Sequence, residues 1–151
     1  MKIRILLLAC FISTMLFAEQ LPMGSWRTHL AYNNTEVIAQ TKDKVYAVSE
    51  GALFSIGKFD NGVEILSKIS GLNDNNILRI GYSKENDILL IAYANSNIDL
   101  LTEDGIFNIS DIYRKNMSGS KTINDIYFKG DYAYLSCDFG IVVLNLKKQE
   151  I

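Results

Sequence analysis

The residue types that most often carry chemistry are scarce in this chain. His29 is the only histidine, and the two cysteines, Cys10 and Cys137, are widely separated among the 151 residues. A lone histidine in an alternating segment is more often structural than a general base. The sequence has no HxxxH or CxxC motif, no glycine-rich phosphate loop and no GxSxG elbow. We therefore expect no catalytic residue, metal site or cofactor.

Most of the aspartates stand where turns are predicted, so their expected role is to hydrogen-bond the nearby backbone. The set is Asp43, Asp74, Asp87, Asp104, Asp111, Asp125 and Asp131. The alternative is a calcium loop such as 73–76. That segment lacks the spaced ligands and the terminal glutamate of an EF-hand loop, which favours turn chemistry.

Two further residue sets have a functional and a structural interpretation. The tyrosines could line a sugar-binding face, but strand tyrosines more often pack half-buried in a sheet. Three segments, 33–35, 108–110 and 116–118, match the short and common glycosylation acceptor pattern. The tyrosines are Tyr32, Tyr46, Tyr82, Tyr93, Tyr113, Tyr127, Tyr132 and Tyr134.

Cys137 stands among apolar strand residues, which predicts a buried and inert thiol.

Residues 1–18 have the pattern of a secretory signal peptide. Lys2 and Arg4 precede an apolar run over 5–17, which is too short to span a bilayer, and Ala18 precedes a polar stretch. Cys10 lies in a segment similar to a lipoprotein acylation box, but the apolar run continues beyond it, so we interpret it as part of the signal core. We expect an exported protein of the periplasm or the outer-membrane cell surface.

Charge and composition exclude some functions. The formal net charge is −2, with no basic stripe, so nucleic acid is not an expected partner. Hydrophobic residues make up 48% of the chain, which predicts a packed core rather than disorder. Abundant tyrosine, phenylalanine and aliphatic residues favour β-sheet.

The rest of the chain repeats a hairpin unit. An apolar strand, a small polar turn and a second apolar strand recur over 44–56, 87–101 and 131–144. The turn residues Gly51, Asn97 and Gly140 tolerate the positive φ that a tight hairpin demands. A short apolar strand precedes each hairpin, at 36–40, 77–82 and 123–128. Fourth strands are predicted over 63–69 and 106–112, after the Asn-Gly and Asp-Gly dipeptides at 61–62 and 104–105.

Four short strands that recur every 43 to 46 residues are typical of β-propeller blades, whereas the runner-up, a β-sandwich, need not repeat. We predict an all-β fold, a partial β-propeller of about two and a half four-stranded antiparallel blades. The blades are expected at 35–75, 76–122 and 123–151, after a lead-in segment at 19–34 with a strand over 26–32. Because propellers close with about four to eight blades, we expect a truncated piece of a longer protein or a chain that closes by oligomerisation.

Several runs resemble PorZ-type proteins of the type IX secretion system. They lie at 24–34, 44–55, 89–101, 122–128 and 133–143, and the similarity covers essentially the whole chain after the signal peptide. The resemblance implies N-terminal propellers and a C-terminal sorting-type domain, the latter absent from these residues. It also implies a place at the outer-membrane surface, in the attachment complex with a PorU-type sortase. The sortase performs the chemistry that attaches secreted cargo to anionic lipopolysaccharide.

The expected function is therefore a non-catalytic scaffold or binding subunit of that attachment complex. Its expected partners are the sortase and anionic lipopolysaccharide, and no binding residue can be assigned from the resemblance. Two alternatives remain open: an extracytoplasmic sensor propeller of a two-component regulator, and a propeller that binds or cleaves glycans. Paired carboxylates facing one pocket would favour the glycan-cleaving enzyme.

Overall fold

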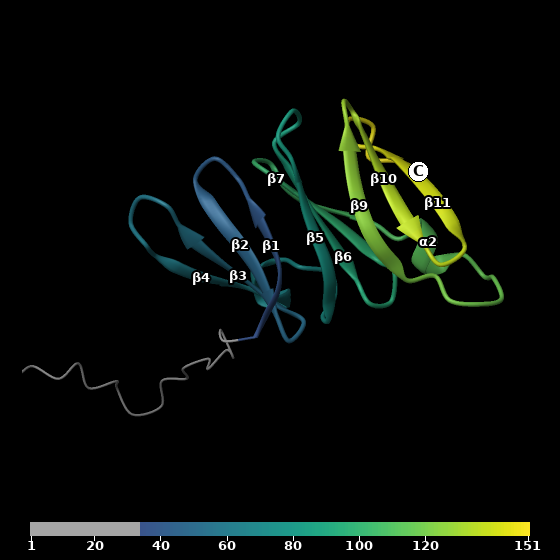
Figure 1. Ribbon diagram of the computed structural model, residues 1–151, viewed down its shortest axis with the longest axis horizontal. Coiled ribbons are helices and arrows are strands. Elements are labelled where there is room, and N and C mark those ends of the chain that lie inside the picture. The colour runs from purple at the N-terminus through teal and green to yellow at the C-terminus, as the bar shows by residue number, and fades with distance from the viewer. Residues whose placement is uncertain (1–33) are drawn as a thin grey trace, which may run out of the picture.

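The structure is a computed structural model that describes residues 34–151. The predicted signal peptide, the strand over 26–32, Cys10, His29 and Tyr32 lie outside the described residues. Within that range the chain forms three antiparallel sheets with strand orders β1-β2-β3-β4, β5-β6-β7-β8 and β11-β10-β9. The all-β partial propeller predicted from the repeat is confirmed, and Figure 1 shows the sheets fanned side by side.

The strands are short and follow one another in chain order. The first sheet contains β1 (Thr35–Gln40), β2 (Lys44–Ser49), β3 (Ala52–Gly57) and β4 (Val63–Leu66). The second contains β5 (Ile77–Ser83), β6 (Ile88–Tyr93), β7 (Ile98–Thr102) and β8 (Gly105–Ile109). The third contains β9 (Ile123–Lys129), β10 (Tyr132–Cys137) and β11 (Gly140–Asn145). An isolated bridge between Asn145 and Glu150 follows β11.

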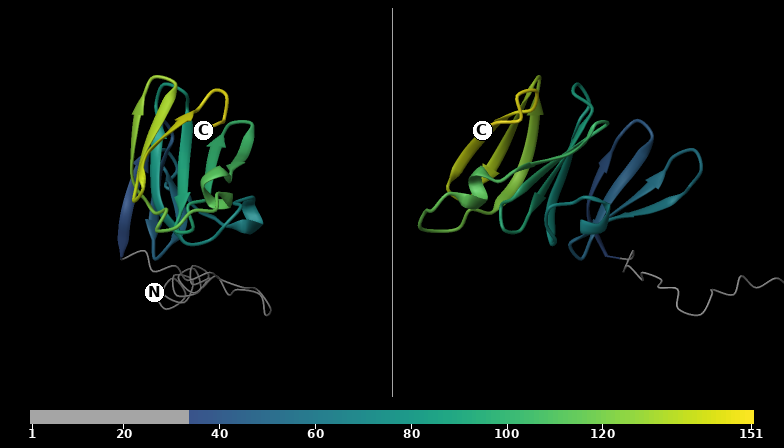
Figure 2. Two further views of the ribbon diagram at one scale, coloured as in Figure 1. Left: turned by 90° about the vertical axis from the view of Figure 1, so that its right-hand side faces the viewer. Right: turned by 180° about the vertical axis from the view of Figure 1, so that it is seen from behind.

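The three sheets meet through their first strands: β1 lies next to β5, and β5 lies next to β9 (Figure 2). This arrangement leaves two rims. The hairpin rim carries the turns inside each sheet at 41–43, 58–62, 84–87, 103–104 and 130–131. The crossing rim carries the two connections between sheets, at 67–76 and 110–122, together with the turns at 50–51, 94–97 and 138–139.

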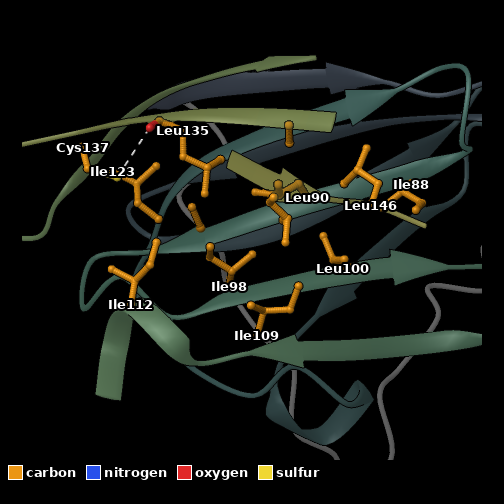
Figure 3. Close-up of a cluster of buried hydrophobic side chains, with 13 residues drawn as sticks. Ile88, Leu90, Ile98, Leu100, Ile109, Ile112, Ile123, Leu135, Cys137 and Leu146 are labelled. Atoms are coloured by element: carbon orange, nitrogen blue, oxygen red, sulfur yellow. Dashed lines mark hydrogen bonds between the residues drawn. The ribbon is translucent and has the colours of Figure 1, made fainter. Parts of the chain in front are cut away.

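The core has two parts, each between two neighbouring sheets. The first join packs the first sheet against the second, with Val48, Leu53, Ile91 and Tyr93 almost fully buried. The second join packs the second sheet against the third around thirteen buried residues (Figure 3). Because successive strand residues point to opposite faces, the second sheet contributes to both joins and is buried on both sides.

A close backbone approach tightens the second join. A Cβ on Gly81 would lie only 2.8 Å from the ring of Phe128. The missing side chain at Gly81 therefore lets the aromatic ring of the third sheet lie directly on β5. A glycine in a strand interior often marks such an approach.

The predicted fourth strands were too long. β4 ends at Leu66 rather than residue 69, because Ser67 caps a 3-10 turn, Lys68–Ser70, by accepting a hydrogen bond from the Ile69 amide at 3.2 Å. β8 ends at Ile109 rather than residue 112, because Asp111–Arg114 form the short helix α2. Ser67 and Ser110 each precede a helical turn that leads toward the next sheet, but only Ser67 caps its turn with a side-chain hydrogen bond. No helix among the described residues is long and apolar enough to cross a membrane.

The hairpin turns follow the predicted chemistry with one exception. Glu50 and Gly51 both have positive φ, as a two-residue hairpin turn of type I′ requires. In the second hairpin, positive φ falls on Ser96 rather than on Asn97. The loop there has four residues, 94–97. The side-chain oxygen of Asn97 accepts a hydrogen bond from the side-chain amide of Asn108 at 3.1 Å.

Candidate functional site

Cys137 is buried as predicted from its apolar neighbours. It lies in the second join, and its Sγ is 3.7 Å from the Leu135 carbonyl oxygen (Figure 3). Burial, with a smaller contribution from the charge of Asp138, raises the pKa of the Cys137 thiol. A buried thiol of raised pKa is a poor nucleophile, so Cys137 serves packing.

Several predicted turn aspartates make local hydrogen bonds or ion pairs. Asp74 accepts from the Asn75 amide and from the Asn95 side chain, and Asp131 pairs with Lys147 at 2.9 Å. Within residues 34–151, no three His, Cys, Asp or Glu side chains come together in a geometry that could hold a metal ion.

Among these turn aspartates, Asp87 makes both a hydrogen bond to a tyrosine and an ion pair with a lysine. Its carboxylate accepts a hydrogen bond from the Tyr82 hydroxyl at 2.5 Å and pairs with Lys42 at 2.5 Å. The hydrogen bond from Lys42 and then that from Tyr82 lower the pKa of Asp87. Burial, followed by the bond to Asp87, raises the pKa of Tyr82 to about 12. This group joins the hairpin-rim turns of the first and second sheets.

Asp99 is the one described carboxylate that is fully buried, and no role was predicted for it from the sequence. It accepts hydrogen bonds from the Tyr93 hydroxyl at 2.5 Å, the backbone amide of Asn73 at 2.8 Å and the side-chain amide of Asn108 at 2.8 Å. The Asn73 side chain adds a fourth bond at 3.0 Å. Burial and the bond to Asp99 raise the pKa of Tyr93.

This network fastens the crossing between the first two sheets to the second sheet. Asp99 is fully buried, and its two carboxylate oxygens accept four hydrogen bonds from protein groups. Its role is therefore positional. An acidic residue inside the apolar strand 98–101 was the sequence signal that could have revealed it, because buried charges require partners. Asn108, one of the glycosylation acceptor matches, is committed to this network.

The tyrosines do not form one sugar-binding face. Tyr46 and Tyr93 are buried in the first join, and Tyr113 is on helix α2. Three others gather on the third sheet, where they stand on the face turned away from the second sheet. These are Tyr127, Tyr132 and Tyr134, of which Tyr127 and Tyr134 have ring centroids 6.4 Å apart.

That face of the third sheet has no neighbouring sheet among the described residues. We call it the outer face. Tyr127 is 63% exposed and Ile141 is 74% exposed. A shallow hollow of about 310 Å³ lies between them. The outer face consists of Asp125, Tyr127, Lys129, Tyr132, Tyr134, Ser136, Ile141 and Val143.

The crossing rim offers a second kind of surface. It holds the longest connections, which are the parts of a scaffold that most often bind partners. Ile69 is 99% exposed there, and Phe139 and Tyr113 are also exposed. Phe139 borders a hollow of about 430 Å³ that Lys115 and Met117 also line. The described part of the crossing rim therefore presents separated apolar side chains.

Comparison with known proteins places this geometry in a family. Residues 45–151 match the family model described as the N-terminal β-propeller domain of PorZ of the type IX secretion system. A solved structure of PorZ from the oral bacterium Porphyromonas gingivalis is 38% identical, with a TM-score of 0.76. It is described as an essential surface component of that secretion system. The alignment covers 83% of this chain and 17% of that one.

A second solved structure shares the fold alone. It is the extracellular domain of a candidate one-component system of B. thetaiotaomicron, with 12% identity and a TM-score of 0.63 over 87% of this chain and 17% of that chain. A search of the curated proteins finds no match. At this identity the likeness shows the fold alone and does not bear on function.

Proposed function

Because the chain belongs to the PorZ N-terminal β-propeller family, we propose that it acts as a non-catalytic binding part of the type IX secretion machinery at the outer-membrane surface. Its proposed partners are a PorU-type sortase and anionic lipopolysaccharide. The observation that carries this proposal is the 38% identity to a PorZ structure over 83% of the chain. Export to the cell surface, by way of the N-terminal signal peptide, is part of the same proposal.

The side chains support binding rather than turnover. The buried carboxylate, Asp99, is fully occupied by protein donors, and the thiol of Cys137 is enclosed in the core. The exposed groups are apolar residues and scattered charges, which suit recognition of a surface. We assign the protein partner to the crossing rim, because its long connections carry the exposed side chains Ile69, Tyr113 and Phe139.

A binding experiment with matched variants tests this assignment. The purified chain is immobilised, and a PorU-type sortase and anionic lipopolysaccharide are passed over it separately. Phe139→Glu changes the crossing rim. Phe59→Glu places the same charge on the hairpin rim, at a side chain that is 84% exposed. We expect Phe139→Glu to weaken sortase binding at least tenfold and Phe59→Glu to leave it unchanged.

The outcomes separate the function from the location of its site. Equal loss in both variants, or in neither, would reject the crossing rim as the protein-binding surface. Failure of the unmodified chain to bind either partner would reject the proposed function for this chain. Binding of lipopolysaccharide alone would limit the function to glycolipid recognition.

A further inference from the structure

We propose that a hollow on the hairpin rim, between the first and second sheets, is an anion site that binds a phosphate group. Its volume is about 470 Å³, and we call it the lysine hollow. The inference gives a place to the anionic partner of the proposed function, and it rests on that function only for the carrier of the phosphate. The lysine hollow is lined by Gln40, Thr41, Lys42, Lys58, Tyr82 and Lys84.

The charge of the lysine hollow is of one sign. Three of its six lining residues are lysines, and none of the six is acidic. The lysines come from three separate turns: Lys42 follows β1, Lys58 follows β3 and Lys84 follows β5. Positive charges that face one hollow repel one another unless an anion lies between them. Two neighbouring sheets therefore meet at a place that favours a bound anion.

The three positive charges are not equally compensated. Lys42 Nζ pairs with the Asp87 carboxylate at 2.5 Å, which neutralises its charge. Lys58 Nζ instead donates to two backbone carbonyl oxygens, those of Thr41 at 2.5 Å and Lys42 at 3.1 Å. Lys84 makes no hydrogen bond or ion pair to the described residues. Lys58 and Lys84 thus have no counter-ion among the described residues.

Lys58 is held in place without a bound anion. Its side chain reaches from the turn after β3 to the turn 41–43, whose carbonyl oxygens accept its ammonium protons. Its backbone amide also donates to the Asp43 carbonyl oxygen, at 2.8 Å. A lysine ammonium is a compact charge that often binds phosphate. A group that is already fixed loses less side-chain entropy on binding than a free one does.

Nearby carboxylates do not line the lysine hollow. Asp43 and Asp60 line a separate hollow of about 370 Å³ on the first sheet. The charges of Glu103 and Asp43 act on Lys42, but neither residue is part of the lining. Asp87 is the one described carboxylate that forms an ion pair with a lining lysine. Asp87 therefore sets how much positive charge the lysine hollow presents.

A phosphate group suits this arrangement. Its charge of about −1.5 to −2 at neutral pH matches the two uncompensated lysines. Its several oxygens can contact Lys58 of the first sheet and Lys84 of the second at the same time. The side-chain amide of Gln40 can donate a further hydrogen bond to it. Bound phosphate would thus connect the hairpin rims of the two sheets.

The experiment titrates inorganic phosphate into the purified chain and follows backbone amide NMR shifts at turns 41–43, 58–62 and 84–87. We expect saturable shifts that weaken as the ionic strength rises, because exposed charges are screened by salt. Lys84→Gln removes an uncompensated charge and should weaken phosphate binding at least fivefold. Lys147→Gln is the matched control, since Lys147 pairs with Asp131 on the third sheet and its loss should leave binding unchanged.

Asp87→Asn should change the affinity in the opposite direction. It removes the carboxylate that neutralises Lys42, so phosphate binding should strengthen at least threefold, which damage to the fold would not cause. Three results would overturn the anion site. These are the absence of saturable shifts, equal weakening in Lys84→Gln and Lys147→Gln, and weaker binding in Asp87→Asn.

A second measurement identifies the carrier of the phosphate. Anionic lipopolysaccharide is passed over the immobilised chain and over Lys84→Gln. Binding that Lys84→Gln weakens at least fivefold, and that inorganic phosphate competes with, places the glycolipid in the lysine hollow. Equal binding to both proteins would overturn that placement and leave the proposed function standing. Binding of inorganic phosphate without lipopolysaccharide would reject the glycolipid partner and support a site for free phosphate.

Discussion

The two joins of this molecule use the same strand register with different chemistry. The first join encloses a buried carboxylate with its amide and hydroxyl donors, and it also buries two tyrosines. The fully enclosed side chains of the second join are aliphatic apart from the Cys137 thiol, and the ring of Phe128 packs against them (Figure 3). The difference indicates a division of roles: apolar area supplies most of the burial energy, while the polar network selects one position for the crossing at 67–76.

Neighbouring leucines of β7 allow the two joins to be compared directly, and the largest effect is expected here. Leu100 is fully buried in the second join, whereas Leu101 is only partly buried against the first. Leu100→Ala should lower the free energy of unfolding by about 2–5 kcal/mol. Leu101→Ala should lower it by less, because its site is already partly solvated. Urea denaturation measures both, and equal losses would contradict the comparison.

Asp99→Asn tests the polar network with almost no change in volume. The side-chain amide places an NH2 group, with two donors, where the carboxylate had an oxygen that accepted two hydrogen bonds, so buried donors face donors without an acceptor. We expect a loss of about 1–3 kcal/mol in unfolding free energy. Hydrogen exchange at the Asn73 amide should accelerate more than exchange in β10. Unchanged protection of that amide would mean that Asp99 does not position the crossing.

Tyr93→Phe removes a single hydrogen bond from the same network. The loss should be about 1 kcal/mol or somewhat more, because the acceptor is a carboxylate. Tyr46→Phe is the matched control in the same join, since its hydroxyl makes no hydrogen bond to the described residues. Thermal unfolding of both variants checks this difference, and equal shifts would assign the effect to packing.

The smallest expected effect is at the hairpin rim and depends on pH. The folded pKa of Asp87 is lowered, so its contribution to stability is present above the ordinary aspartate pKa and is lost as the pH falls through the lowered value. Asp87→Asn should therefore be less stable than the unmodified chain at pH 7, with the gap closing in acid. Denaturation at pH 7 and at about pH 2 compares the two proteins. A gap of constant size would show that the ion pair with Lys42 contributes nothing.

Much of the architecture could be predicted from local patterns. The hairpins around Gly51 and Gly140 and the strand before each hairpin follow from alternation and turn chemistry, which act between near neighbours. Local patterns did not predict correctly where β4 and β8 end. Apolar residues continue through Ile69 and Ile112, and only the capping geometry at Ser67 and the helix at Asp111 end the strands earlier.

The period, the antiparallel hairpins and the resemblance to a PorZ propeller can be read from the amino-acid sequence alone, because they depend on residue types at short spacing. The tertiary structure decided which strand face is buried, that Asp99 connects a crossing to its sheet, and that the tyrosines divide between the core and the outer face. Burial depends on which sheet lies opposite, and that neighbour is tens of residues away in the chain. For this reason Tyr93 and Tyr127, alike in the sequence, have different environments in the fold.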